Sequence, residues 1–455
     1  MTALHDHAVQ PPATTSPAPV SRAGVVETLR LTGAALAPML ARGIILRRPP
    51  LVRLADRLQL DDRAVRALQA SRRRHGDGPL LLRVPGRSLA LVLSARDAGR
   101  VLAEGPTPFS PATREKRAAL QHFQPRGVLI SPPEDRPARR AWNETALQLD
   151  VPLHAQAASV AQIAAQELSG LRTAGRWDWE AFAPAWWRVV RRLTLGDAAR
   201  DDEALTDLLG RLRSRANWAF LRRTDGPARA ELLRRLDIYV QAAEPGSLAA
   251  TVAALPADPD VHVADQIAHW LFAWDAAGIA TFRALALLAG HPAHAAAVAS
   301  EVDRADPVAP DLPLLRATVL ESVRLWPTTL AVLRESTQDT TWAGSTVPAG
   351  TTFVITSSLA HRDDELLPDA DRFAPQLWAD DDAPGGTSAS LWSMVPFSAG
   401  PARCPGRDLV LYTTGVALSV LTAGHRLEQA AGRRVAEGTA LPRSLDHTAL
   451  AYRVS

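Results

Sequence analysis

The chain has 455 residues, of which 47% are hydrophobic, so it can bury a large core. Its formal net charge is only +3, and its arginines are interspersed with acids instead of forming a basic face with stacking aromatics, which excludes nucleic acid as an expected partner. A single cysteine excludes an intramolecular disulfide framework and fits a reducing compartment, so we expect a cytoplasmic protein.

The first 50 residues differ in composition from the rest. Residues 1–24 are polar and proline-rich and lack the basic and apolar regions of a signal peptide, so we expect a disordered tail. Residues 25–50 contain an uncharged run that is interrupted by Pro38 and followed by arginines. Because this run is shorter than the roughly 20 apolar residues that span a bilayer, we expect residues 25–50 to pack on the core. Peripheral contact with a membrane surface is the alternative.

Residues 51–455 show no internal repeat and no linker that would separate two cores. The hydrophobic periodicity and the Gly and Pro breaks indicate a helix at residues 51–74, a β-hairpin at 80–93 and an irregular proline-rich loop at 105–134. A long helical region at 136–288 and short strands at 331–355 follow. We therefore expect one large, mainly α-helical domain with a small β component.

Glu321 and Arg324 lie on a helix that ends before Pro327. Their i, i+3 spacing places the carboxylate and the guanidinium on one helix face, where they can pair. An exposed pair of this kind is common on any helix and contributes well under about 1 kcal/mol. The spacing alone therefore assigns no role to the pair.

The only cysteine lies in the segment Phe397-Ser-Ala-Gly400-Pro-Ala-Arg403-Cys404-Pro-Gly406. An apolar helical pattern follows, so Cys404 comes just before a helix N-terminus, where unpaired amides and the macrodipole favour an anionic thiolate. The glycines allow a tight turn and the close approach of a flat, bulky partner. This setting suits a metal-bound sulfur, and an inert buried cysteine is the alternative.

The pattern Phe-x-x-Gly-x-x-x-Cys-x-Gly resembles the haem-ligand signature of the cytochrome P450 superfamily. The resemblance extends from about residue 51 to the end of the chain, and it implies the fold of that family. It also implies a haem b cofactor with Cys404 as the iron ligand, and cofactor-binding roles for Phe397, Gly400, Gly406 and the adjacent Arg403. The family often has arginine or histidine two residues before the cysteine, where this chain has alanine.

In this family the Glu-x-x-Arg pair is structural and supports the core on the haem side. The resemblance therefore implies that neither Glu321 nor Arg324 is catalytic. The chain departs from the family in the segment Phe373-Ala-Pro-Gln-Leu377-Trp378, where Leu377 replaces an arginine that usually joins the pair.

The resemblance also implies which arginines bind the haem propionates, since the guanidinium fork suits carboxylates. Arg334 falls where the family places such an arginine. Arg139 closes a Pro-Pro-Glu-Asp-Arg-Pro-Ala-Arg segment that resembles the family's Pro-Pro-Glu-His-x-x-x-Arg, with Asp135 in place of the histidine. Arg136 and Arg140 are the substitutes for Arg139.

A long apolar helix contains Asp275-Ala-Ala277-Gly278-Ile-Ala280-Thr281, which resembles the family's oxygen-activating segment. The resemblance implies catalytic roles for Ala277, Gly278 and Thr281: the glycine lets the helix loosen beside dioxygen, and the threonine positions water and delivers protons. Ala280 stands where the family has an acid. Either protons arrive through water held by Thr281, with help from Asp275, or the enzyme depends less on ordinary oxygen activation.

The function that the resemblance implies is a haem-thiolate monooxygenase that inserts one oxygen atom of O2 into a small lipophilic substrate of secondary metabolism, by hydroxylation or epoxidation. Residues 105–129, 205–250 and 328–332 are expected to select the substrate. Electrons are expected from a ferredoxin and a ferredoxin reductase, because the sequence contains no flavin or iron–sulfur module.

Two alternatives stay open. One is a haem-thiolate enzyme with different chemistry, which is driven by peroxide or catalyses coupling or rearrangement; Ala280 motivates it. The other is a haem-binding sensor or carrier without turnover.

Overall fold

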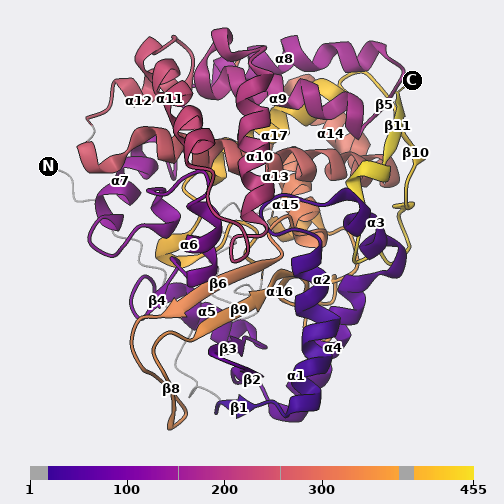
Figure 1. Cartoon of the computed structure of the whole chain (residues 1–455). Helices are drawn as coiled ribbons and strands as arrows, with labels where there is room; N and C mark the ends of the chain where they lie inside the picture. The colour runs from indigo at the N-terminus through magenta and orange to yellow at the C-terminus, as the bar shows by residue number, and fades with distance from the viewer. Residues whose placement is uncertain (1–18, 152, 257, 379–393, 455) are drawn as a thin grey trace, which may run out of the picture.

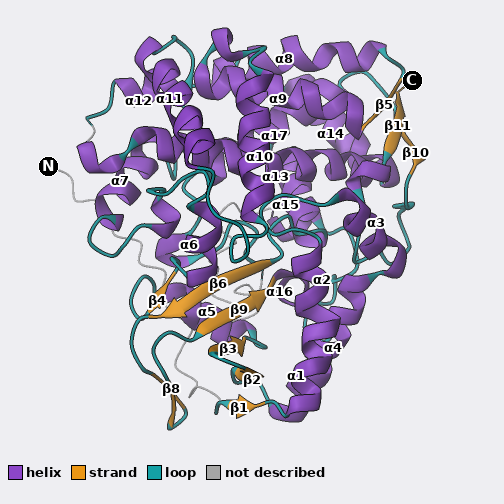
Figure 2. Ribbon diagram, viewed as in Figure 1, coloured by secondary structure: helices purple, strands orange, loops and turns teal. Residues whose placement is uncertain are grey.

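The computed structural model describes residues 19–151, 153–256, 258–378 and 394–454. Most of the described residues lie in helices around a long central helix, and a mixed β-sheet occupies the lower part of the molecule in the view of Figures 1 and 2. The expected fold class, mainly α-helical with a small β component, is confirmed. Residues 1–18 of the expected N-terminal tail lie outside the described residues.

The helices begin where the sequence offers caps. Ser94, Thr113, Asp178, Asp202 and Ser247 each accept a hydrogen bond from an amide in the first turn of the helix that follows. The helices are α1 (Val25–Leu31), a π-helical turn (Thr32–Leu36), α2 (Ala37–Ala41), α3 (Pro49–Leu58), α4 (Leu60–His75), α5 (Ala95–Ala103), α6 (Arg114–Leu120), α7 (Arg136–Ala146), α8 (Ala157–Thr173), α9 (Trp179–Leu195), α10 (Glu203–Ala216), α11 (Gly226–Ala242), α12 (Leu248–Ala253), α13 (Val263–Gly290), α14 (Pro292–Arg304), α15 (Pro313–Leu325), α16 (Ser357–Arg362) and α17 (Arg407–Thr422).

The strands form one larger sheet and two small ones. The larger sheet has the order β1-β2-β3-β9-β6-β4, and it is mixed because β1 pairs with β2, and β3 with β9, in parallel. Its strands are β1 (Ser21–Arg22), β2 (Leu80–Val84), β3 (Arg87–Leu91), β4 (Phe109–Ser110), β6 (Ala331–Ser336) and β9 (Thr352–Thr356). One small sheet contains β5 (Arg176–Asp178), β10 (Leu427–Ala431) and β11 (Ala451–Val454). The other contains β7 (Thr340–Trp342) and β8 (Ser345–Val347).

The expected disordered tail ends earlier than residue 24. The amide of Ser21 donates to the carbonyl oxygen of Pro79 at 3.1 Å, and the amide of Ala23 donates to that of Leu81 at 2.9 Å. The open edge of β2 supplies these partners from a distant part of the chain. Local composition cannot show such a partner, so the expectation was wrong for residues 19–24.

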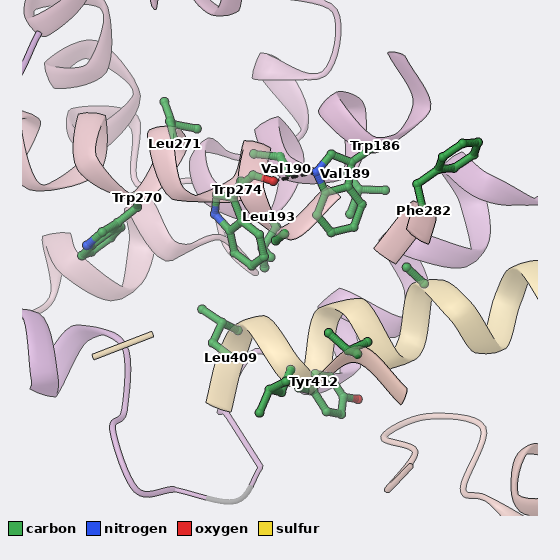
Figure 3. Close-up of a cluster of buried hydrophobic side chains, with 14 of the residues drawn as sticks. Trp186, Val189, Val190, Leu193, Trp270, Leu271, Trp274, Phe282, Leu409 and Tyr412 are labelled. Atoms are coloured by element: carbon green, nitrogen blue, oxygen red, sulfur yellow. Dashed lines mark hydrogen bonds between the residues drawn. The ribbon is translucent and has the colours of Figure 1, made fainter. Parts of the chain in front are cut away.

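α13 runs through the hydrophobic core and contacts α9, α11, α15 and α17. Trp186 of α9 donates its indole N–H to the carbonyl oxygen of Trp274, 3.0 Å away, and the two rings meet edge to face (Figure 3). Among the described residues α13 is the one helix that is long and apolar enough to cross a membrane, but 78% of that stretch is buried inside the protein. It is therefore a core helix that is apolar because other helices surround it.

Residues 25–50 pack against the rest of the chain. α1 contacts α4 and β2, and the π-helical turn lies against α4. Asn217, which follows α10, accepts hydrogen bonds from the amides of Ile45 and Leu46 at 3.0 and 3.3 Å and donates to the carbonyl oxygen of Leu46 at 2.7 Å. The end of this segment is thereby fixed to the C-terminus of α10.

Arg213 of α10 joins three parts of the structure. Its guanidinium donates to the carbonyl oxygen of Ile45 at 3.0 Å and to the carboxylate of Asp275 in α13 at 2.6 Å. Arg213 is almost fully buried, so this contact between the N-terminal segment, α10 and α13 is shielded from water.

Several buried histidines should make the protein less stable in mild acid. Burial is the main cause that lowers the pKa of His269, His294 and His361 to about 4. The unfolded chain binds a proton on each of them near a pKa of about 6.5, whereas the folded chain does not. The free energy of unfolding should therefore fall between pH 7.5 and pH 5.5, by about 1 kcal/mol for the buried His361 and by less for His294, which is partly exposed to solvent.

The measurement is the thermal unfolding midpoint of the protein at pH 7.5, 6.5 and 5.5. His361→Asn removes one of the titrating groups, so its midpoint should change less with pH than that of the wild type. His425→Asn, in the turn after α17, is the control and should follow the wild type. Equal pH dependence in His361→Asn and the wild type would show that His361 is not held neutral by the fold.

Candidate functional site

The segment from Phe397 to Gly406 forms a tight loop before α17. The amide of Cys404 donates to the carbonyl oxygen of Phe397 at 2.9 Å and closes the loop. Gly400 has a positive φ of 67°, and a Cβ atom at this position would lie 2.1 Å from the carbonyl oxygen of Leu102 in α5. Glycine is therefore required both for the turn and for close packing against α5.

Cys404 lies two residues before the N-cap of α17. The residue is partly exposed, and burial raises the pKa of its thiol. The Gly406 amide, Arg140 and Arg407 oppose this rise. The helix N-terminus favours the thiolate through the Gly406 amide, as expected, but desolvation outweighs this contribution. A metal cation on the sulfur would deprotonate it.

The structure brings two of the three residues predicted to be catalytic together on α13. The hydroxyl of Thr281 donates to the carbonyl oxygen of Ala277, one turn earlier, at 2.9 Å. Gly278 faces α9 instead, since a Cβ atom there would lie 2.6 Å from the indole ring of Trp186. This contact gives a packing reason for the glycine. The catalytic roles of Thr281, Ala277 and Gly278 stay predictions.

Both acids of α13 are already engaged. Asp275 pairs with Arg213 at 2.6 Å, and Asp265 accepts a hydrogen bond from the amide of Arg126 at 2.8 Å. Ala280 offers only its carbonyl oxygen, which accepts a hydrogen bond from the hydroxyl of Ser322 in α15 at 2.7 Å. Proton transfer from Asp275 to Thr281 would first require Asp275 to leave Arg213.

Three cations lie close to the Cys404 loop: Arg136 and Arg334, which are buried, and Lys116, which is partly buried. Arg334 donates through Nη2 to the hydroxyl of Ser398 in that loop at 3.0 Å, and both Arg334 Nη1 and Lys116 Nζ donate to the carbonyl oxygen of Leu333 at 3.0 Å. Burial is the main cause that lowers the pKa of Lys116 well below its usual value, and Arg334 and Arg136 add to it. Burial likewise lowers the pKa of both arginines to about 10. We call these three residues the cation cluster.

The cation cluster fits an anion that is not part of the chain. Within the described residues, its members donate to carbonyl and hydroxyl oxygens and form no ion pair with a carboxylate. The Nε atom of Arg334 is buried without a hydrogen-bond partner. Unpaired buried cations are strongly unfavourable. The two propionates of a haem would supply the missing charges beside a cysteine loop that can hold its iron. The residues present therefore fit haem.

Arg139 lies outside the cation cluster. It donates to the carbonyl oxygen of Asp260 at 2.8 Å and to the hydroxyl of Ser131 at 2.9 Å, and it pairs with Asp135 at 2.9 Å. Asp135, which replaces the family's histidine, thus pairs with Arg139, the arginine that the sequence pointed to. Arg136, its neighbour and expected substitute, takes the place in the cluster.

Arg403 and Lys116 also differ from the sequence prediction. Arg403 pairs with Asp150 at the surface and lies outside the cation cluster. Lys116 was missed as a cofactor-binding candidate, although it carries a signal, since it is the only lysine in the sequence. Of the three arginines predicted to bind the cofactor, Arg334 is the one that the structure places in the cluster.

Glu321 and Arg324 form a fully buried pair on α15, with Arg324 Nε 2.5 Å from Oε1 and Nη2 2.7 Å from Oε2. Glu321 also accepts hydrogen bonds from the amide of Ala374 at 2.7 Å and from the indole of Trp378 at 2.8 Å, and Arg324 donates to the carbonyl oxygen of Arg372 at 2.6 Å. The pair fastens the loop that precedes the cysteine segment to α15. Its role is structural, as the resemblance implies.

Glu321→Ala should destabilise the protein by about 3–5 kcal/mol, because it leaves the Arg324 guanidinium buried without its carboxylate. The thermal unfolding midpoint measures this loss. Glu231→Ala is the matched control: Glu231 of α11 pairs with Arg234 and Arg235 at i, i+3 and i, i+4, but at the surface, so its midpoint should change little. Similar midpoints for the two variants would contradict a structural role for the buried pair.

Comparisons with known proteins agree with this geometry. The family model described as Cytochrome P450 matches residues 275–427, which include the predicted catalytic residues, the buried pair on α15 and the cysteine loop. A solved structure of a cytochrome P450 (CYP102L1) is similar with a TM-score of 0.69 at 18% identity, and covers 97% of this chain and 99% of its own. The retinoic acid-bound cyanobacterial CYP120A1 is similar with a TM-score of 0.67 at 19% identity, over 85% of this chain and 93% of its own.

Sequence relatives match over shorter stretches. Cyclooctat-9-en-7-ol 5-monooxygenase of Streptomyces melanosporofaciens is 32% identical over 181 residues, which are 38% of this chain and 39% of the relative. Beta-amyrin 11-oxidase of Glycyrrhiza uralensis is 31% identical over 115 residues, which are 25% of this chain and 22% of the relative. The chain thus matches less than half of the length of these curated relatives.

Proposed function

The chain belongs to the cytochrome P450 superfamily, whose cofactor is haem b, and on this premise we propose that it is a haem-thiolate monooxygenase that inserts one oxygen atom of O2 into a lipophilic organic substrate. The observation that carries the proposal is the arrangement of the cation cluster beside the Cys404 loop, linked by the hydrogen bond from Arg334 to Ser398. A desolvated thiol and, beside its loop, cations without a carboxylate partner match the two ends of one cofactor, the iron and the propionates.

The residues of this chain would divide the work as follows. Cys404 would bind the iron through its sulfur, and Lys116, Arg136 and Arg334 would neutralise the propionates and fix the orientation of the ring. Thr281 can release its hydrogen bond to Ala277 and hold a water molecule or pass on a proton instead. Haem bound through a thiolate supplies the reductive activation of O2. The balance is one substrate C–H bond, O2, two electrons and two protons giving one C–OH group and water.

For the substrate and the partners we propose the following. The substrate is lipophilic and belongs to secondary metabolism, which is supported by the two named relatives, a cyclooctat-9-en-7-ol monooxygenase and a beta-amyrin oxidase. Hydroxylation or epoxidation is the reaction, with electrons from a ferredoxin and its reductase that dock on the Cys404 side. The protein would act in the cytoplasm, without nucleic acid and with at most peripheral contact with a membrane.

A carbon monoxide difference spectrum of the reduced protein tests the thiolate ligand. The wild type should show the Soret band of thiolate-ligated haem, and Cys404→Ser should lose this band while the cation cluster still retains porphyrin. Ala402→Ser, a serine placed two residues earlier in the same loop, is the control and should keep the band. Protein without porphyrin after expression with ample haem, or an unchanged band in Cys404→Ser, would contradict the proposal.

A second candidate is a haem-thiolate enzyme driven by peroxide, and the state of the acids on α13 favours it. Ala280 provides no carboxylate, and Asp275 is held by Arg213. We expect Ala280→Asp to raise the product formed per NAD(P)H consumed by up to about tenfold if protons limit oxygen activation. The measurement compares turnover with ferredoxin, reductase and O2 against turnover with hydrogen peroxide.

The result separates the candidates. Faster turnover of the wild type with peroxide, together with no gain in Ala280→Asp, would favour the peroxide-driven enzyme. Haem binding without turnover under either condition, with ligands that shift the Soret band, would favour a sensor or carrier. The control is Ala280→Asn, because asparagine has the size of aspartate and is polar but cannot supply a proton.

A further inference from the structure

One face of α13 is partly exposed although most of the helix is buried in the core. His269, Phe272, Ala273 and Ala276 are partly exposed, as is Asp275, whereas Trp270, Leu271, Trp274 and residues 277–288 are buried. Their positions follow i, i+3, i+4 and i+7, so they share one side of the helix. Phe123, from the loop that the sequence predicts to select the substrate, faces this side with its ring centroid 5.5 Å from that of Phe272. We call this side of α13 the pocket face.

His269 differs from the other polar side chains of α13. Gln266, Asp275, Thr281 and Arg283 all form hydrogen bonds within the protein, and Asp265 does so with the amide of Arg126. His269 has only a ring contact with Phe272, at 5.9 Å between centroids, and its Nδ1 atom is buried without a hydrogen-bond partner among the described residues. An enclosed nitrogen without a partner is unfavourable. Because the residue as a whole is partly exposed, a molecule outside the chain can approach the imidazole from its accessible edge.

The charge state of His269 defines what can complete it. Burial lowers its pKa to about 4, and the positive charge of Lys116 on α6 adds to this effect. The imidazole is therefore neutral near pH 7, with one nitrogen that donates and one that accepts. A neutral oxygen that can accept or donate a hydrogen bond, as in an alcohol or a ketone, matches such a group better than a carboxylate does.

We propose that His269 hydrogen-bonds an oxygen atom of the substrate, and that the substrate is a lipophilic molecule that already carries a hydroxyl or keto group. This inference rests on the proposed monooxygenase function and narrows its substrate class. It also places the reaction in a sequence: an oxygen-introducing reaction, such as an earlier hydroxylation or a cyclisation that ends with capture of water, must supply the substrate.

The spacing along α13 also predicts how far the oxidised carbon lies from the existing oxygen of the substrate. His269 and Ala276 are seven residues apart, which corresponds to about 10 Å along the helix axis. The side chain of Ala273 between them is small, so this part of the pocket face leaves room for a ring system. The existing oxygen would be held at one end of the pocket face, and the predicted catalytic residues Ala277 and Thr281 follow at the other end. The oxidised carbon should therefore lie several bonds from that oxygen.

The test uses the full-length, haem-loaded protein and two matched pairs of probes, adamantane with 1-adamantanol and cedrene with cedrol. The dissociation constant of each probe is measured from the shift of the Soret band on binding. The wild type should bind each alcohol about tenfold more tightly than its hydrocarbon, as expected for one buried hydrogen bond. His269→Phe should remove this preference and keep the affinity for the hydrocarbons.

Two further variants separate the hydrogen bond from general damage. His269→Gln, which has both a donor and an acceptor, should keep part of the preference for the alcohols. His425→Phe, after α17, should behave as the wild type. The reduction potential of each variant is recorded as well, because it responds to contacts with the cofactor and not to the choice between two neutral probes.

The outcomes distinguish the inference from the proposed function. Equal affinity for alcohols and hydrocarbons in the wild type, or an unchanged preference in His269→Phe, would overturn the inference and leave the monooxygenase proposal intact. A shifted reduction potential in His269→Phe, with the preference for alcohols unchanged, would mean that His269 contacts the propionates. This result would also overturn the inference. Tighter binding of adamantane-1-carboxylate than of 1-adamantanol would mean that Lys116, and not His269, binds the polar group of the ligand, and would overturn the inference. Absence of the thiolate Soret band, or of binding by every probe, would count against the proposed function itself.

Discussion

Three desolvated positive charges beside one thiol set the main physical constraint on this structure. Lys116, Arg136 and Arg334 are held by carbonyl and hydroxyl oxygens, which solvate a cation only in part. The thiol of Cys404 is pushed towards its neutral form by the same desolvation. A cofactor with two carboxylates and a metal cation removes both penalties at once. On the proposed function, haem binding would therefore contribute to the stability of the native state.

α13 meets two demands on opposite sides. One side must pack tightly, and there Gly278 lies so close to the indole of Trp186 that a Cβ atom would not fit. The other side must stay open, and there small residues such as Ala273 and Ala276 leave space. A helix can do both because its side chains project at fixed angles around the axis. The glycine that the family resemblance links to oxygen activation therefore has a packing role as well.

Much of the fold could be predicted from the sequence because its signals are local. The cysteine loop, the pair on α15 and the long apolar helix were recognised from spacing within one segment, and the mainly α-helical class was confirmed. The sequence pointed to Arg139 as a propionate ligand and could not show that Arg139 lies outside the cation cluster, since its contacts with Asp260 and Ser131 depend on how distant segments meet. The same holds for Lys116 and His269. Their burial, and hence their altered pKa values, follows from tertiary contacts alone.

The thiol of Cys404 shows a further limit of local reasoning. Its position before a helix favours the thiolate, and that contribution is present in the structure, but a larger one opposes it. A motif shows which interactions exist and does not show their relative size. That comparison requires knowledge of how much water each group has lost.

The contact made by Arg213 has a consequence for how molecules reach the pocket face. One guanidinium holds the Ile45 carbonyl oxygen and the Asp275 carboxylate, so α10 cannot swing outward without freeing both. The motion is then cooperative across the N-terminal segment, α10 and α13. An outward movement of α10 would also free the carboxylate of Asp275 from its ion pair.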